Sequence, residues 1–121
     1  MYPSIETNQT INQNQYLGSQ NGSYFLILQP DGNLVGYKSL DFGPHNAFWS
    51  SKTDGKGVGP FRLVMQGDSN LVLYDGQNKP IWSSGTEGKG TPGYSKLIIQ
   101  NDKNIVIYDR NNKPIWASNT C

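Results

Sequence analysis

Cysteine and histidine are almost absent from this chain of 121 residues, which contains one of each. Cys121 is the last residue and has no second cysteine with which to close a disulfide within the chain. A lone thiol in a chain that begins with methionine suits a reducing compartment, so the sequence predicts a cytoplasmic protein. His45 lies in a predicted loop without cysteine or histidine partners, which excludes the usual zinc sites and a histidine-based catalytic triad.

Long apolar runs and an excess of charge of one sign are also missing. No segment has the roughly 20 consecutive apolar residues that a membrane-spanning helix requires. Residues 1–15 have neither the basic start nor the apolar stretch of a secretory signal. The 10 basic and 9 acidic residues give a net charge of +1, and no cluster of Lys or Arg is present, which argues against nucleic acid as a partner. The composition is that of one soluble domain.

What the chain does contain is a nine-residue pattern, Gln-x-Asp-x-Asn-x-Val-x-Tyr, three times with every defined position intact. Its copies are Gln29, Asp31, Asn33, Val35 and Tyr37; Gln66, Asp68, Asn70, Val72 and Tyr74; and Gln100, Asp102, Asn104, Val106 and Tyr108. The copies begin 37 and 34 residues apart (66 − 29 and 100 − 66). Such a period indicates one supersecondary unit repeated, in which each unit needs its neighbours to bury its apolar face.

Two of the copies are followed at the same offset by Lys-Pro-Ile-Trp, at 79–82 and 113–116. On these motifs the chain resembles the monocot mannose-binding lectins, the bulb-type family that includes snowdrop agglutinin, over nearly its whole length. The resemblance implies an all-β fold, a type II β-prism of three four-stranded antiparallel sheets with pseudo-threefold symmetry and one mannose pocket per sheet. It implies one lectin domain over residues 1–121, with repeats at about 17–51, 58–84 and 92–118. The plant lectins carry a disulfide inside one repeat, and this chain does not.

Each motif straddles the turn of a predicted β-hairpin. Apolar runs at 24–28, 61–65 and 94–99 lead into turns, and the second halves of the motifs, 33–37, 70–74 and 104–108, return as partner strands. Because side chains alternate along a strand, Leu34 and Gly36 face away from the motif residues, towards the core. A third short strand ends each unit at Trp49, Trp82 or Trp116. We expect these tryptophans to fill the core about the axis rather than to stack on sugars.

The segment before the first motif has two interpretations. Ile5, Ile11 and Leu17 stand in otherwise polar surroundings, which favours short edge strands over a helix. A stretch so rich in Asn and Gln is also typical of disorder.

The repeated polar residues match the chemistry of a neutral hexose, whose hydroxyls both donate and accept hydrogen bonds. Asp only accepts, Gln and Asn carry both functions, and Tyr has one hydroxyl. The resemblance implies that Asp and Asn hold the axial 2-hydroxyl of mannose, Gln the 3-hydroxyl and Tyr the 4-hydroxyl, with Val beneath the ring. The predicted sugar-binding residues are Gln29, Asp31, Asn33, Tyr37, Gln66, Asp68, Asn70, Tyr74, Gln100, Asp102, Asn104 and Tyr108. Each Asp also has a simpler interpretation as a turn residue that hydrogen-bonds its own backbone.

The leading hypothesis is a multivalent protein that binds mannose and mannose-rich glycans without catalysis, cofactor or metal. A glycosidase needs two carboxyl groups within about 10 Å of each other, whereas the repeat places one Asp on each sheet. Comitin-type amoebal proteins carry a similar module in the cytosol, on Golgi and vesicle membranes, and bind actin. The alternative is therefore a cytosolic linker between vesicles and actin. Family members commonly dimerise through their carboxy-terminal strand, so we also expect a non-covalent homodimer.

The first repeat is the irregular one. Its tyrosine and tryptophan are 12 positions apart (49 − 37), against 8 in the other repeats (82 − 74 and 116 − 108). Gly36 also replaces the Leu73 and Ile107 of its siblings, which leaves a gap on the core face. We expect Phe42 or Leu40, from the longer loop, to fold back into this gap. All three sites should bind mannose, the second and third similarly and the first differently.

Overall fold

The computed structural model describes residues 4–121, and its regular structure is almost entirely β. The strands are β1 (Ser4–Glu6), β2 (Thr10–Asn12), β3 (Tyr16–Gly18), β4 (Phe25–Leu28), β5 (Leu34–Tyr37), β6 (Ala47–Ser50), β7 (Arg62–Met65), β8 (Leu71–Tyr74), β9 (Pro80–Ser83), β10 (Lys96–Ile99), β11 (Ile105–Tyr108) and β12 (Pro114–Ala117). Two short 3-10 helices are η1 (Pro44–Asn46) and η2 (Arg110–Asn112). Neither helix in the described residues has the length or apolar character needed to cross a membrane.

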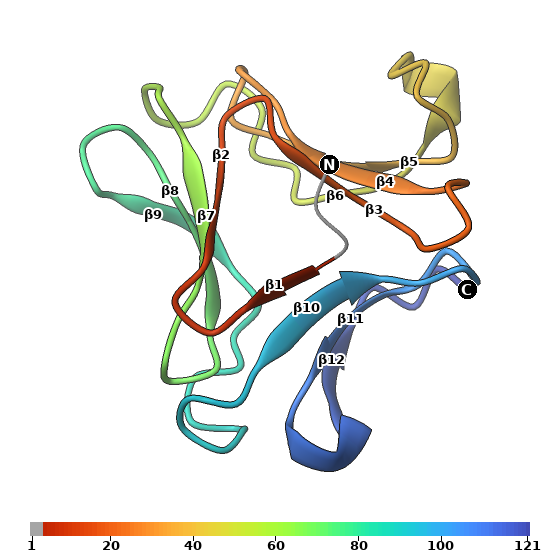
Figure 1. Ribbon diagram of the computed structural model, residues 1–121. Coiled ribbons are helices and arrows are strands. Elements are labelled where there is room, and N and C mark those ends of the chain that lie inside the picture. Colours follow the sequence, from red (N-terminus) through yellow and green to blue (C-terminus); the bar gives the residue numbers. More distant parts are fainter. Residues whose placement is uncertain (1–3) are drawn as a thin grey trace.

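The strands form three four-stranded antiparallel sheets. Their strand orders are β3-β4-β5-β6, β2-β7-β8-β9 and β1-β10-β11-β12. Figure 1 shows the sheets arranged around a common centre, with the three hairpins of the motifs on different sides of the molecule. The predicted β-prism is confirmed.

The first three strands each join a different sheet. β1, β2 and β3 pair with β10, β7 and β4, and Figure 1 shows the chain passing from one sheet to the next. Their central residues, Ile5, Ile11 and Leu17, are at most 2% exposed. Asn8 and Asn14 lie between them with φ angles of 69° and 71°, a region that asparagine enters more readily than most residues. Edge strands are therefore the correct interpretation, and part of the Asn-rich composition serves the turns.

One row of core residues crosses each sheet from its first strand to its last. In the first sheet the register pairs Leu17 with Leu26, Leu26 with Gly36, and Gly36 with Trp49. The other rows are Ile11, Leu63, Leu73 and Trp82, and Ile5, Leu97, Ile107 and Trp116. The three tryptophans meet edge to face, with ring centroids 5.8 to 5.9 Å apart, and pack against the core. This confirms their predicted place, because such ring pairs stabilise a packed interior.

The space beside Gly36 is filled by Phe48, from the neighbouring strand of the same sheet. The register shifts by one residue where β5 meets β6, and this β-bulge puts Phe48 on the core side beside the tryptophan. The same bulge holds Ile81 and Ile115 in the other repeats. A Cβ atom at Gly36 would lie 2.8 Å from the Phe48 ring. The first repeat therefore keeps its core volume by exchanging a large and a small residue between two adjacent strands.

The prediction that Phe42 or Leu40 fills this gap is wrong. Leu40 is 59% exposed, and Phe42 packs against Tyr37 and Val35 on the other face of the sheet. Phe48 already occupies the space beside Gly36, so the loop has no opening to the core. The inserted loop instead alters the outer face, where the motif lies.

Two carboxylates fasten the linkers between the repeats. Asp75, which is 2% exposed, accepts hydrogen bonds from the backbone amides of Lys79 at 2.9 Å and, across the linker, Val58 at 3.4 Å. Asp109 accepts from the amide and the hydroxyl of Thr91, at 2.8 and 3.3 Å. Both aspartates directly follow a motif tyrosine. Asp75 thus joins the end of β8 to the linker that precedes β7, and Asp109 joins the end of β11 to the linker that precedes β10. These hydrogen bonds stabilise the linkers between neighbouring sheets.

Asp75 should make the fold sensitive to acid. The backbone amide of Lys79 is the main cause that lowers the pKa of Asp75 from its ordinary value of 3.8. Because the folded protein then binds this proton less readily than the unfolded chain, the stabilisation is full above the unfolded pKa and disappears as the pH falls through the folded pKa. We expect the urea midpoint to drop as the pH falls below the ordinary aspartate pKa of 3.8. Asp75→Asn should be less stable at neutral pH and should show a smaller drop; an equal drop in both proteins would contradict this assignment.

Candidate functional site

The three motifs occupy corresponding places on the three sheets. In each, Gln directly follows one strand of a hairpin, Asp lies in the turn, Asn precedes the returning strand and Tyr ends it. The first site comprises Gln29, Asp31, Asn33 and Tyr37 on β4 and β5, the second Gln66, Asp68, Asn70 and Tyr74 on β7 and β8, and the third Gln100, Asp102, Asn104 and Tyr108 on β10 and β11. The fold thus brings the members of each set together and keeps the three sets on separate sheets.

Each motif aspartate uses one carboxylate oxygen inside the turn. Oδ1 of Asp31, Asp68 and Asp102 accepts a hydrogen bond from the backbone amide two residues later, at 2.9 to 3.0 Å. The turn-forming interpretation is therefore correct for one oxygen. The aspartates are exposed, and their Oδ2 atoms accept no hydrogen bond from the described part of the chain. The turn fixes the carboxylate and leaves its second oxygen available to a ligand.

Each motif asparagine is held by a Ser-x-Thr segment that sequence reasoning missed. Oδ1 of Asn33 accepts from the hydroxyl of Ser51 and from the backbone amide of Thr53, both at 3.2 Å. The Thr53 hydroxyl lies 2.7 Å from that of Ser51 and donates to the carbonyl oxygen of Gly32 at 2.6 Å. Ser84 with Thr86, and Ser118 with Thr120, repeat this arrangement around Asn70 and Asn104.

This segment determines which way the asparagine amide points. A backbone N–H only donates, so the atom that meets the threonine amide is the oxygen, and Nδ2 faces the other way. The middle residue of each Ser-x-Thr has a φ between 58° and 70°, which turns the threonine back towards the hairpin. The signal was present in the sequence, because each Ser-x-Thr begins two positions after a tryptophan.

Glutamine and tyrosine form a second fixed pair in every site. Nε2 of Gln29 donates to the Tyr37 hydroxyl at 2.6 Å, and the same hydrogen bond joins Gln66 to Tyr74 and Gln100 to Tyr108. Since the tyrosine oxygen accepts this bond, its hydrogen is directed elsewhere. Each pair therefore presents a hydroxyl donor and a glutamine carbonyl acceptor side by side.

The first site differs from the others in its walls. Tyr37 is 4% exposed, whereas Tyr74 and Tyr108 are only partly buried. The loop residues Phe42 and Pro44 line the same pocket of about 470 Å³ as the four polar residues of the motif. The longer loop of the first repeat therefore changes the surroundings of its motif.

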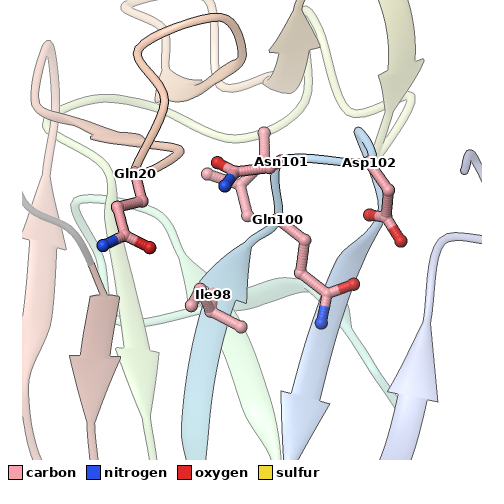
Figure 2. A pocket seen from close by; sticks show the side chains of 6 residues that line it. Gln20, Ile98, Gln100, Asn101 and Asp102 are labelled. Atoms are coloured by element: carbon pink, nitrogen blue, oxygen red, sulfur yellow. The ribbon is translucent and has the colours of Figure 1, made fainter.

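A pocket of about 420 Å³ adjoins the third site, where it meets a loop from the first repeat. Figure 2 shows Gln20, from the loop between β3 and β4, on one side of this pocket and Gln100 and Asp102 on the other. The backbone amide of Asn21 donates to Oδ1 of Asn101 at 2.8 Å, which attaches the loop to the tip of the hairpin. The third site is therefore bordered by a polar residue of another repeat.

The acidic and histidine residues do not assemble into a reactive centre. The three motif aspartates lie on different sheets, and residues 4–121 contain no group of three His, Cys, Asp or Glu side chains suited to a metal ion. His45 is exposed in η1, with its Nε2 3.7 Å from Oδ2 of Asp41. Each site offers hydrogen-bond donors and acceptors in fixed positions, which is what a neutral polyhydroxyl ligand requires.

Comparison with known proteins agrees with this geometry, although no protein-family model matches the chain. A mannose-specific lectin of Aloe arborescens is 38% identical over 89 residues, which cover 74% of this chain and 73% of that protein. A solved structure of monomeric monocot mannose-binding lectins from Gastrodia elata is 36% identical, with a TM-score of 0.82 over 98% of this chain and 97% of that one. Comitin of Dictyostelium discoideum is 42% identical over 80 residues, which cover 64% of this chain but only 43% of comitin.

The fold and the repeated polar sites define a β-prism lectin. Within that class, the chain belongs to the monocot mannose-binding lectin family, as the Aloe and Gastrodia proteins show. Both relatives are described as mannose-binding lectins, which supports the prediction of a lectin rather than an enzyme.

Proposed function

We propose that the chain binds mannose, and mannose-rich glycans, at all three motif sites. One observation carries the proposal: the same hydrogen-bond network orients Asp, Asn, Gln and Tyr on the outer face of every sheet. All four side chains are held by hydrogen bonds within the protein, and each keeps an atom free for a ligand: the aspartate Oδ2, the asparagine Nδ2, the glutamine carbonyl oxygen and the tyrosine hydroxyl hydrogen. A site prepared in this way loses little conformational entropy when a sugar binds.

The free atoms of each site match one edge of a mannose ring. The aspartate Oδ2 and the asparagine Nδ2 would accept from and donate to the axial 2-hydroxyl. The glutamine carbonyl would accept a hydrogen bond from the 3-hydroxyl, and the tyrosine hydroxyl would hydrogen-bond the 4-hydroxyl. The valine would lie beneath the ring carbons. Glucose places its 2-hydroxyl equatorially, so the Asp and Asn groups would lack their partner at a cost of about 1–3 kcal/mol.

Each site should be weak by itself. A monosaccharide has about a dozen heavy atoms, and at roughly 0.3 kcal/mol per atom the binding free energy is near 4 kcal/mol, or about millimolar affinity. Three sites on separate sheets allow one molecule to engage several mannose residues of a glycan or a glycosylated surface. Multivalency of this kind raises the overall affinity by about 10²–10⁴.

Titration with methyl α-D-mannoside, followed by backbone amide chemical shifts, tests the proposal site by site. We expect saturable shifts around Asp31, Asp68 and Asp102, and no equivalent shifts with methyl α-D-galactoside. Equal responses to the two sugars would contradict mannose recognition.

Tyr108→Phe should weaken the third site by about 1 kcal/mol, because one hydroxyl is lost while the ring and the neighbouring Asp102 and Asn104 remain. The same titration measures this change, and the first and second sites of the variant serve as internal controls. A third site whose affinity is unchanged would show that the tyrosine hydroxyl does not contact the sugar.

The remaining expectations from the sequence stay predictions. These are the repeat boundaries at about 17–51, 58–84 and 92–118, the homodimer, the cytoplasmic location, and a role linking vesicle or Golgi membranes to actin. Sedimentation in reductant tests the dimer, since monomer alone would contradict it. Retention on a mannose column, compared with co-sedimentation with actin filaments, separates the lectin function from the linker function.

A further inference from the structure

We infer that the first site prefers mannosides that carry an apolar group on the C6 side of the ring, and that Phe42 determines this preference. The inference rests on the proposed mannose binding. It concerns only the first site, because the feature that carries it is absent from the other two.

Four aromatic rings gather at the tyrosine end of the first site. The ring of Phe42 lies 5.0 Å from that of Tyr37, tilted by 37°, and 6.1 Å from that of Tyr16. Tyr16 in turn meets Phe25 edge to face at 5.9 Å, and Phe25 is the register partner of Tyr37. With Ile27 and Val35, these rings form an apolar cluster on the outer face of the sheet, in which Tyr16 and Phe42 are the partly exposed members.

The corresponding places in the other sheets are cationic. Arg62 is the register partner of Tyr74 and Lys96 that of Tyr108, where the first sheet has Phe25. The Arg62 guanidinium lies 4.6 Å from the centre of the Tyr74 ring. Neither of these sites has a loop residue equivalent to Phe42, because the four-residue insertion belongs to the first repeat.

The position of Phe42 relative to a bound sugar follows from the roles of the motif residues. In the proposed orientation the tyrosine receives the 4-hydroxyl, so the next ring atom beyond it is C5, which bears C6. Phe42 packs on Tyr37, and Pro44 and Ala47 line the same pocket, so this wall would face the C5–C6 edge. The pocket of about 470 Å³ lies in the size range of sites that hold ligands larger than one hexose. Ser50 and Asp54 also line this pocket, but the part of its wall formed by Phe42, Pro44 and Ala47 is apolar, which fits an apolar substituent there.

Comparison of methyl α-D-mannoside with its 6-O-benzyl ether tests the inference. Backbone amide shifts report the three hairpins separately in one titration. At the first site we expect the benzyl ether to bind on the order of tenfold more tightly than the parent sugar, since its ring gains aromatic contacts and leaves water. At the second and third sites the two ligands should bind with similar affinity.

Variants of the loop show whether Phe42 is responsible. Phe42→Ala should remove the tenfold difference, and Phe42→Leu should retain part of it, because leucine keeps some apolar surface. Leu40→Ala is the matched control: it lies in the same loop, is 59% exposed and does not line the pocket, so the difference should persist.

Three results would overturn the inference: the same preference at all three sites, a preference unaffected by Phe42→Ala, or weaker binding of the benzyl ether at the first site. If the parent methyl mannoside did not bind at the second and third sites, the proposed function would instead be refuted. The two failures are distinguishable, because the first concerns the difference between two ligands that both bind, whereas the second is the absence of binding by the parent sugar.

Discussion

Replacing Gly36 by leucine, the residue at the corresponding position of the second repeat, should destabilise the fold by about 1–3 kcal/mol. The Cβ atom alone would lie 2.8 Å from the Phe48 ring, so the ring must move to admit any side chain at this position. The change should be visible as a lower midpoint of urea unfolding. An unaltered midpoint would mean that Phe48 leaves the core easily.

The second substitution of this test is Phe48→Ile, which introduces the isoleucine that the second and third repeats have at the equivalent position. Alone it should also destabilise, because Gly36 then faces an unfilled space. Together the two changes reproduce the packing of the second repeat, so their combined cost should be smaller than the sum of the single costs, with an interaction energy of about 0.5–3 kcal/mol. Ile81→Phe is the matched control, since Leu73 leaves no room for a larger ring. It should destabilise without rescue from either change in the first repeat.

Replacing Asn104 by aspartate should abolish measurable mannose binding at the third site. The change keeps the size of the side chain but removes the Nδ2 donor and adds a negative charge close to Asp102. The lost hydrogen bond costs at least about 1–3 kcal/mol, which is enough to silence a millimolar site. The Thr120 amide and the Ser118 hydroxyl hold an oxygen at this position already, so the fold should tolerate the variant.

The design contains its own control. Asn70→Asp should silence the second site and leave the third intact, and each variant should leave the first site unchanged. Titration with methyl α-D-mannoside would show the loss as the absence of saturable shifts around Asp102 or Asp68. If saturable shifts persist around Asp102 in the Asn104 variant, the asparagine amide has no part in binding the sugar.

Local patterns along the chain determined much of the architecture. The turn residues around Asp31 and its equivalents place a hairpin at each motif, and the alternation of side chains separates the motif residues from Leu34 and its core-facing equivalents. Threefold repetition then implies three units that share one core. For the same reason the polar members of each proposed site could be predicted from the sequence: they lie within nine residues of one another, on one strand face and one turn.

The tertiary structure alone decided the contacts between segments that are distant in sequence. Ser51 and Thr53 reach Asn33 from 18 and 20 positions away, and their roles depend on how the third strand returns along the second. Phe48, rather than Phe42, fills the space at Gly36 because a β-bulge turns its side chain towards the core. The position of a β-bulge could not be predicted from the alternation of apolar and polar residues. The sequence by itself thus determined which residues make each hairpin and its polar face, since those are local properties of the backbone. Which side chains hold that face in place, and which close the core behind it, depended on the packing of three sheets against one another.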